Sequence, residues 1–305
     1  MRHVLTLFEL TAAEIQRVFE VTEELKTQWK QGQRQPLLAG RVMGLLFEKP
    51  SLRTRVSFET GMAQLGGSSL FLGEDVGWGT REALSDFSRV LSQYVDVLVC
   101  RAKAHRTVES LAEHATCPVI NGLTDLAHPC QALADLYTMR EIHGELAGQK
   151  LAYIGDANNV ASSLLLGCAR LGVQFAIASP PGYDFDPQFV AQVKQEHPQM
   201  EFLETRDPIE AVRDASAVYT DVWVSMGQEA QRDERVQAFA DYQVNHDLMQ
   251  QAAPNACFLH CLPARRGEEV TDQVLDGPQS AVVQQAGNRM HAQKGLLAWL
   301  LGAAS

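Results

Sequence analysis

Short apolar runs alternate along this chain with longer amphipathic segments, almost from end to end. Short apolar runs bounded by turn residues predict buried strands, and apolar positions at helical spacing predict helices. Strands are expected at 42–47, 68–72, 96–100, 117–121, 150–154, 173–179, 217–220, 256–261 and 281–284. Helices are expected at 11–30, 53–65, 81–94, 107–115, 129–143, 159–171, 186–196, 208–214, 245–252 and 286–302. This alternation indicates an α/β fold with parallel sheets flanked by helices.

A polar segment at 143–149 follows a long predicted helix and has the composition of a domain junction. It divides the predicted strands into near-equal groups, and 305 residues are enough for two domains of ordinary size. We therefore expect one domain at 1–143 and another at 148–285. The polar stretch 222–242 predicts a long loop with little core, of the kind that closes over a site.

Composition narrows the classes of partner. A net charge of −11 disfavours a broad surface for nucleic acid or for an anionic membrane, so a cationic cluster here favours a small anion. No apolar run approaches the roughly 20 residues of a bilayer span, and the N-terminus lacks a signal-peptide pattern. We expect a cytoplasmic protein with no nucleic-acid or membrane partner. The cysteines form no CxxC pair, which favours buried thiols over a metal site.

The most informative stretch is Ser51-Leu52-Arg53-Thr54-Arg55, which lies between the apolar run 42–47 and a helical pattern. Its hydroxyls and guanidiniums would stand at a helix N-terminus, where unpaired N–H groups and the positive end of the dipole favour phosphate. A helix capped by Ser51, with solvated arginines, is the alternative.

Other polar residues of the first half also follow predicted strands. Arg101 ends the run 95–100, at the sheet edge where parallel sheets bind ligands. In His128-Pro129-Cys130-Gln131, Pro129 suits the first helical position, so His128 and Gln131 would face the same opening. A histidine can polarise a carbonyl and a glutamine can accept from an NH₂ group. A surface arginine and a capping histidine are the alternatives.

The second half offers groups that suit an amino acid. Asn158 and Asn159 follow a predicted strand and open a helix, and the turn before them lacks GxGxxG. Asp221 and Ser225 could hold an ammonium group, although lone Asp and Ser residues in loops are more often turn formers. Cys261 ends another strand, and Arg289 lies near the start of the final helix. Together these groups suggest a cleft with phosphate on one wall and a zwitterion on the other.

Taken together, these motifs resemble the aspartate/ornithine carbamoyltransferase family over the whole chain. The segment 47–59 resembles the family's carbamoyl-phosphate loop, and His128-Pro129-Cys130-Gln131 matches its HPxQ motif. Residues 221–227 match its DxxxSMG loop, and His260-Cys261-Leu262-Pro263 matches HCLP; these two favour the ornithine branch. The resemblance implies two α/β domains with an active site between them, the last helix (286–305) returning to the first domain, and a catalytic trimer.

The resemblance also implies the site residues. The carbamoyl phosphate site would comprise Ser51, Leu52, Arg53, Thr54, Arg101, His128, Gln131, Leu262 and Arg289. The ornithine site would comprise Asn159, Asp221, Ser225, Met226 and Cys261. The groups at the reacting atoms would be Arg53, Arg101, His128, Gln131, Cys261 and Arg289.

Three positions depart from the family pattern. Leu52 replaces the usual Thr of the phosphate loop and removes one hydroxyl, although the backbone N–H at that position remains. The usual glutamine of the following loop falls near Gly77 or Trp78, which puts one contact from a neighbouring subunit in doubt. Arg265 stands where His is common after HCLPA.

The implied reaction is carbamoyl transfer from carbamoyl phosphate to the δ-amine of ornithine, which yields citrulline and phosphate. It needs neither a cofactor nor a metal, because positioning and fixed oxyanion donors suffice for an activated carbamoyl donor. The leaving phosphate could take the proton of the amine, or Cys261 and Asp221 could adjust the protonation of the amine. The alternatives are a carbamoyltransferase for putrescine, acylated ornithine or aspartate, a nicotinamide oxidoreductase, and a non-catalytic relative.

Overall fold

The computed structural model describes residues 2–77, 80–225 and 227–304, and the chain forms two compact units. The first unit comprises Met1–Ala134 and Asn288–Ser305, and the second comprises Asp135–Gly287. The division falls inside helices α5 (Pro129–His143) and α12 (Val282–Leu300), so each helix contributes residues to both units. The sequence places the junction after α5 instead, and those domain ranges stay a prediction.

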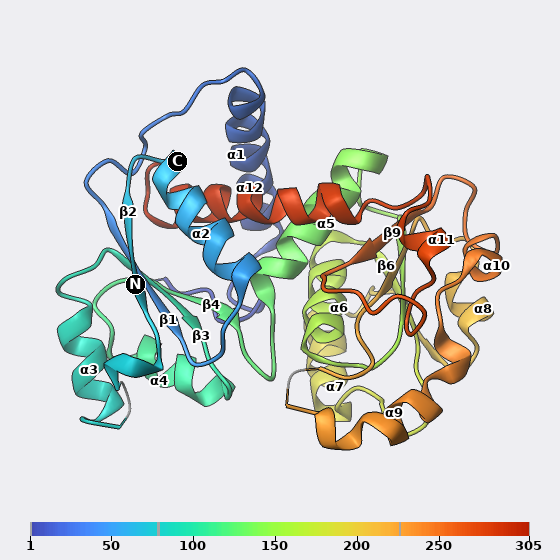
Figure 1. Ribbon diagram of the computed structural model, residues 1–305. Helices are drawn as coiled ribbons and strands as arrows, with labels where there is room; N and C mark the ends of the chain where they lie inside the picture. Colours follow the sequence, from blue (N-terminus) through green and yellow to red (C-terminus); the bar gives the residue numbers. More distant parts are fainter. Residues whose placement is uncertain (1, 78–79, 226, 305) are drawn as a thin grey trace. The chain divides into compact units, whose positions relative to one another are not determined.

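The first unit is built on a parallel sheet in the order β2-β1-β3-β4. Its strands are Val42–Phe47 (β1), Ser68–Leu72 (β2), Val97–Arg101 (β3) and Val119–Leu123 (β4). Its helices, besides the shared ones, are Ala12–Lys30 (α1), Leu52–Gln64 (α2), Leu84–Leu91 (α3) and His105–His114 (α4). Helices α3 and α4 pack on one face of the sheet, whereas α2 and α12 lie on the other (Figure 1).

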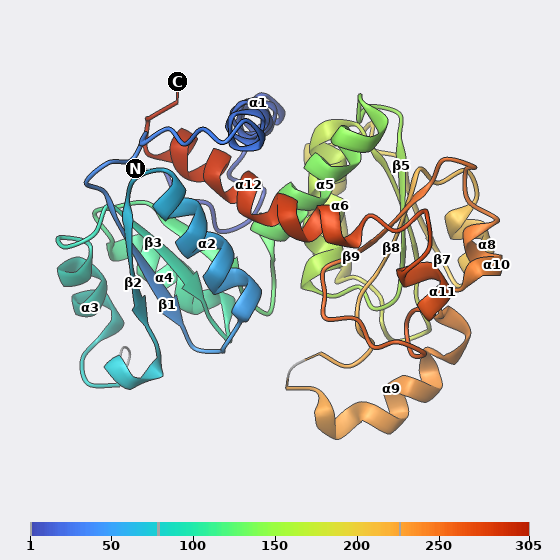
Figure 2. The ribbon, with the colours of Figure 1, turned by 45° about the horizontal axis from the view of Figure 1, so that its top comes forward.

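The second unit contains a parallel sheet in the order β7-β6-β5-β8-β9. Its strands are Lys150–Ile154 (β5), Gln174–Ala178 (β6), Phe202–Thr205 (β7), Ala217–Thr220 (β8) and Cys257–His260 (β9). Its other helices are Asn159–Leu171 (α6), Pro187–Glu196 (α7), Pro208–Val212 (α8), Arg232–Ala238 (α9), His246–Met249 (α10) and Asp272–Leu275 (α11). Helices α8, α10 and α11 flank this sheet in the rotated view (Figure 2).

Each sheet contains a switch point, which is a pair of adjacent strands whose following connections run toward opposite edges of the sheet. In the first unit the chain passes from β1 outward to β2 and then returns to β3 on the other side. In the second it passes from β5 to β6 and β7 and returns to β8. Ligands of open parallel sheets bind at the carboxyl ends of such strand pairs, so the loops after β1, β3, β5 and β8 are the places to search.

The α/β prediction is confirmed, but one predicted strand is wrong and one strand was missed. Residues 281–284 are not a strand: α12 begins at Val282, and Val283 is 81% exposed. A short apolar run cannot distinguish a strand from one face of a helix. The sequence also missed β7, whose residues are only half-buried or exposed and so give no continuous apolar run.

The stretch 222–242 has more core than its polar composition suggests. It contains α9, and both Phe239 and Tyr242 belong to the main apolar cluster of the second unit. Trp223 and Val224 at its start are buried in the same cluster. In the described part of the chain, no helix combines the length and apolar character needed to cross a membrane.

Candidate active site

The turn after β1 caps helix α2 in the way that an anion site requires. Ser51 is the N-cap, and its Oγ accepts the N–H of Thr54 at 3.3 Å. The N–H groups of Leu52 and Arg53 have no backbone partner among the described residues, as is usual in a first helical turn. Leu52 directs its side chain to solvent, being 75% exposed, so this position can serve an anion through its N–H alone.

Three polar groups of the first unit converge on the hydroxyl of Thr54, which is itself buried. Arg101 Nη1 lies 3.4 Å from Thr54 Oγ1, Arg289 Nη2 lies 3.1 Å from it, and Ser51 Oγ lies 3.0 Å from it. Arg289 also donates to Gln131 Oε1 and approaches His128 Nε2 at 3.4 Å. We call Thr54, Arg101, His128, Gln131 and Arg289 the cationic cluster.

Positive charge dominates the cationic cluster. Arg101 and Arg289 are each only 6% exposed, and both reach the same neutral oxygen. Burial lowers the pKa of His128 well below its ordinary value, and the charges of Arg289 and Arg101 lower it further. His128 is therefore neutral at physiological pH, so it can donate or accept a hydrogen bond without adding a third charge. Such a cluster is suited to a small dianion.

The two arginines of the phosphate turn differ in their surroundings. Arg53 is exposed at the second position of α2. Arg55 pairs with Glu59 at 3.1 Å and stacks 3.8 Å above the ring of Phe71, away from the cationic cluster. Of the two, only Arg53 stays a candidate for the phosphate.

In the second unit, polar groups converge on the carboxylate of Asp221, directly after β8. Asn158 Nδ2 donates to Oδ2 at 3.0 Å, while the Cys261 thiol and the Val222 N–H donate to Oδ1 at 3.0 and 2.8 Å. Asn158 is also the N-cap of α6, because its Oδ1 accepts the Val160 and Ala161 N–H groups. We call Asn158, Asp221 and Cys261 the acidic clasp.

The acidic clasp has the electrostatic character opposite to that of the cationic cluster. Tyr153 and Tyr219 stack near it with ring centroids 5.5 Å apart. Burial raises the pKa of both phenols well above the usual value, and the charge of Asp221 contributes to both shifts. A negative potential that disfavours phenolate favours a bound ammonium group.

Cys261, Asp221 and His260 also present ligand atoms within 4.8 Å of one another, a set that could hold a metal ion. Both ring nitrogens of His260 are engaged, however: Nδ1 accepts the Leu262 N–H, and Nε2 lies 3.2 Å from Glu269 Oε1. A metal ion at His260 would have to break one of these bonds. The arrangement therefore favours a role for the thiol and the carboxylate in binding a substrate rather than a metal ion.

The other predicted residues of the second unit lie in the same loops. Asn159 is the first residue of α6, next to Asn158. Ser225 follows β8, where its N–H donates to Gln228 Oε1 at 3.0 Å. Leu262 follows Cys261 and has a positive φ of 58°. Met226 lies outside the described residues, as does Trp78, whereas Gly77 has a φ of 68°.

The sequence prediction did not include two features of these loops. Asn158 contacts Asp221 directly, and its position before a helix was the available signal. Arg235 of α9 is buried and donates to the Trp223 carbonyl and to Asp156, and its guanidinium stacks 4.8 Å from the ring of Tyr183. Burial raises the pKa of Asp156, although Arg235 opposes that shift. Nothing in the sequence around Arg235 distinguishes it from its solvated neighbours.

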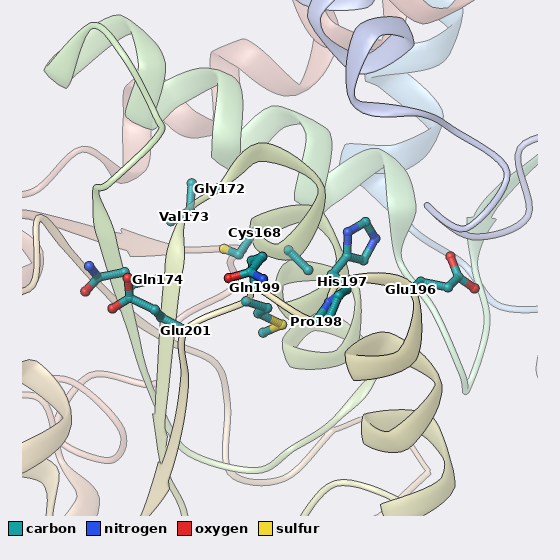
Figure 3. A pocket seen from close by; sticks show the side chains of 11 residues that line it. Cys168, Gly172, Val173, Gln174, Glu196, His197, Pro198, Gln199 and Glu201 are labelled. Carbon is teal, nitrogen blue, oxygen red and sulfur yellow. The ribbon is translucent and has the colours of Figure 1, made fainter.

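A separate cavity of about 260 Å³ lies in the second unit, at the opposite edge of the sheet from the acidic clasp. The ends of α6 and α7 and the start of β6 form its walls. Its polar side chains do not converge: Gln174 and Glu201 lie on one side and Glu196 on the other (Figure 3). We do not assign it to the site.

Two parallel sheets, each with a polar cluster at its switch point, define an α/β protein that binds small charged molecules. The carbamoyl-P binding domain of the aspartate/ornithine carbamoyltransferases matches residues 2–141, and their Asp/Orn binding domain matches residues 147–300. The chain belongs to this family.

Relatives and solved structures agree with this membership. An ornithine carbamoyltransferase of Anoxybacillus flavithermus is 52% identical, over 97% of this chain and 96% of the relative. An ornithine carbamoyltransferase of Pyrococcus furiosus, named as anabolic, is 47% identical over 99% of this chain and 96% of the relative. The solved structure of an ornithine carbamoyltransferase from Pyrococcus furiosus superposes with a TM-score of 0.95 at 47% identity, over 99% of this chain and 97% of that one.

Proposed function

We propose that the protein is an ornithine carbamoyltransferase, which transfers the carbamoyl group of carbamoyl phosphate to the δ-amine of L-ornithine and releases L-citrulline and phosphate. One observation carries the proposal: in a chain of this family, the two switch points hold clusters of opposite charge. A cationic cluster suits the phosphate of an acyl phosphate, and an acidic clasp suits the ammonium groups of a diamino acid.

The first unit binds carbamoyl phosphate in this proposal. The N–H groups at the start of α2, with Ser51, Arg53 and Arg101, hold the phosphate. Thr54 and neutral His128 donate to the carbamoyl oxygen. The Leu262 carbonyl and Gln131 Oε1 accept from its NH₂ group, and Arg289, which donates to Gln131 Oε1, orients that oxygen. We assign the carbamoyl-phosphate-binding domain to residues 1–143 together with the last helix, 286–305.

The second unit, at 148–285, binds ornithine. Asn159, Asp221, Ser225 and Met226 hold the α-amino and α-carboxylate groups. Asp221 and Cys261 lie near the δ-amine. The direct bond from Asn158 to Asp221 fixes the orientation of that carboxylate.

The chemistry is nucleophilic substitution at the carbamoyl carbon. The neutral δ-amine attacks that carbon, a tetrahedral oxyanion forms, the bond to the phosphate oxygen breaks, and the leaving phosphate takes the proton that the amine nitrogen loses. Donors already in place around the oxyanion stabilise it more in the transition state than in the ground state, and binding removes the entropic cost of bringing two molecules together. Transfer needs no covalent intermediate on the enzyme, no metal and no cofactor.

The physiological setting follows from the same assignment. The product is consumed in arginine biosynthesis, in the cytoplasm, and the active assembly is a homotrimer or a multiple of trimers. The naming of a relative as anabolic supports the biosynthetic direction. Sedimentation of the purified protein tests the trimer, and a monomer would contradict it.

A citrulline assay with a panel of amines tests the activity itself. The purified protein receives carbamoyl phosphate and, in separate reactions, ornithine, N-acetylornithine, putrescine or aspartate. Ornithine should be carbamoylated with a kcat/KM about 100-fold or more above the others, since each analogue leaves polar groups of the site unpaired. A preference for putrescine or N-acetylornithine would contradict the proposal.

A further inference from the structure

Beneath the turn 261–263 lies a buried pair of titratable residues to which no role has yet been given. His260 ends β9 and is 1% exposed, and Glu269 is fully buried. His260 Nδ1 accepts the backbone N–H of Leu262 at 2.8 Å, and Nε2 lies 3.2 Å from Glu269 Oε1. A backbone N–H can only donate, so Nδ1 carries no proton and the ring proton is on Nε2, where it points to Glu269.

Glu269 is itself fixed. Its Oε1 accepts a second bond, from the Arg265 N–H at 2.5 Å, so two N–H groups share this oxygen. Burial raises the pKa of Glu269, whereas the bond from His260 lowers it. Both N–H groups need an acceptor oxygen, which a neutral side chain can also provide.

The backbone of His260 is held as well. Its N–H donates to Gln285 Oε1 at 2.9 Å, and Gln285 Nε2 donates to Asp135 Oδ1 at 2.6 Å. The side chains of Asp135, His260, Glu269 and Gln285 are all buried, and all four residues belong to the second unit. The imidazole is therefore rigid with respect to the end of β9.

The turn that His260 supports is conformationally costly. Leu262 has a φ of 58°, a left-handed conformation that is unfavourable for a non-glycine residue and persists where the surroundings over-determine it. The bond from the Leu262 N–H to His260 supplies such a constraint. The preceding residue, Cys261, contacts Asp221 of the acidic clasp.

We propose that His260 and Glu269 are positioning residues of the carbamoyl-transfer site. Glu269 fixes the tautomer of His260, and His260 holds the Leu262 peptide. Cys261 thereby stays on Asp221, and the Leu262 carbonyl stays in place for the carbamoyl NH₂ group. This inference rests on the proposed function, because those two groups are the ones assigned to the substrates.

A pair of amide variants of His260 tests the proposal. In His260→Asn the side-chain oxygen can stand where Nδ1 stands and accept the Leu262 N–H, whereas in His260→Gln the amide reaches the place of Nε2. We expect His260→Asn to retain a kcat within several-fold of the wild type and His260→Gln to lose about 100-fold. The two should have similar melting temperatures. Equal activities, or activities that simply follow the melting temperatures, would overturn the proposal.

A pair of Glu269 variants separates acceptor from charge. Glu269→Gln keeps an oxygen for the His260 and Arg265 N–H groups, so its kcat should stay near that of the wild type. Glu269→Leu has a similar volume and no acceptor, and its kcat should fall about 100-fold. An equal loss in both variants would overturn the role given to Glu269.

Alkylation of Cys261 gives a readout that does not depend on turnover. The other five cysteines are buried and Cys261 is half-buried, so iodoacetamide should modify it first. His260→Gln should change the alkylation rate several-fold, because the thiol loses its fixed position on Asp221, while His260→Asn should not. A wild type that forms no citrulline would refute the proposed function yet leave this comparison intact. An unchanged rate in His260→Gln would overturn the positioning role.

Discussion

The cationic cluster and the acidic clasp occupy equivalent places in two similar sheets, yet their charges are opposite. Each lies where a parallel sheet reverses its strand order, and each uses a helix N-cap, Ser51 in one case and Asn158 in the other. Two buried arginines surround Thr54 in the first unit, whereas a carboxylate is the centre in the second. The fold thus provides the position, and a few loop residues choose the sign of the ligand.

Titratable neighbours respond to that difference in sign. His128 loses affinity for a proton because burial and two guanidiniums disfavour its charged form. Tyr153 and Tyr219 keep their protons because burial and nearby acidic groups disfavour phenolate. These three side chains therefore stay neutral around neutral pH, which suits a site that must hold two charged substrates without rearrangement.

The largest expected effect comes from removing one cation of the cationic cluster. Arg101→Met keeps the length of the side chain but removes a buried donor, and we expect kcat/KM for carbamoyl phosphate to fall about 1000-fold. Initial rates of citrulline formation measure it. Arg55→Met removes an arginine that pairs with Glu59 instead, and it should keep nearly full activity. Similar losses in both variants would remove the special role of the cluster.

A substitution in the acidic clasp should affect the binding of ornithine rather than that of carbamoyl phosphate. Asp221→Asn keeps the shape of the side chain but loses the charge, so KM for ornithine should rise and kcat/KM should fall about 100-fold. The matched control is Asp247→Asn, which removes the same charge from an exposed position in α10. An unchanged KM for ornithine in Asp221→Asn would refute the assignment of this carboxylate.

Arg235 tests whether the segment after β8 depends on one buried ion pair. Arg235→Met leaves the half-buried carboxylate of Asp156 without its guanidinium, and breaking a largely buried pair in this way costs about 3 kcal/mol. Calorimetric unfolding should show a lower melting temperature, and KM for ornithine should rise with little change for carbamoyl phosphate. The double variant Arg235→Met/Asp156→Asn should recover part of the lost stability. A single variant as stable as the wild type would contradict this account.

The smallest effect concerns a cation of the first unit outside the cluster. Lys294 is 2% exposed and donates to Gln64 Oε1 at 3.0 Å, and burial lowers its pKa to about 8, with Arg34 contributing. Between this value and 10.5, its ordinary pKa, the unfolded state binds more protons, so stability should rise with pH. In Lys294→Met the melting temperature should be less dependent on pH in that window. An unchanged pH dependence would contradict burial of the charge.

The sequence predicted most of the fold because apolar strands buried on both faces give continuous runs. Helices α5 and α6 begin and end where the sequence places them. Errors occurred where burial was partial, as at β7, or where a short apolar run belonged to a helix, as at Val282. The polar stretch 222–242 misled because Arg235 is buried through a carboxylate and aromatic rings that lie far from it in sequence.

The candidate site was accessible from the sequence to a similar degree. Strand-end reasoning and motif spacing selected Arg101, His128, Asp221 and Cys261, and the structure brings these residues into two clusters. Local patterns could not reveal that Thr54 is the shared acceptor of two arginines, because Arg289 comes from a helix at the far end of the chain. The buried pair of His260 and Glu269 was hidden for the same reason.

The central claim is that each switch point recognises its own substrate by charge. Isothermal titration with a phosphonate analogue of carbamoyl phosphate, in which CH₂ replaces the bridging oxygen, tests it most directly. We expect Arg101→Met to abolish binding of the analogue and Asp221→Asn to bind it with the affinity of the wild type. Unchanged affinity in Arg101→Met, or loss of binding in Asp221→Asn, would contradict the account.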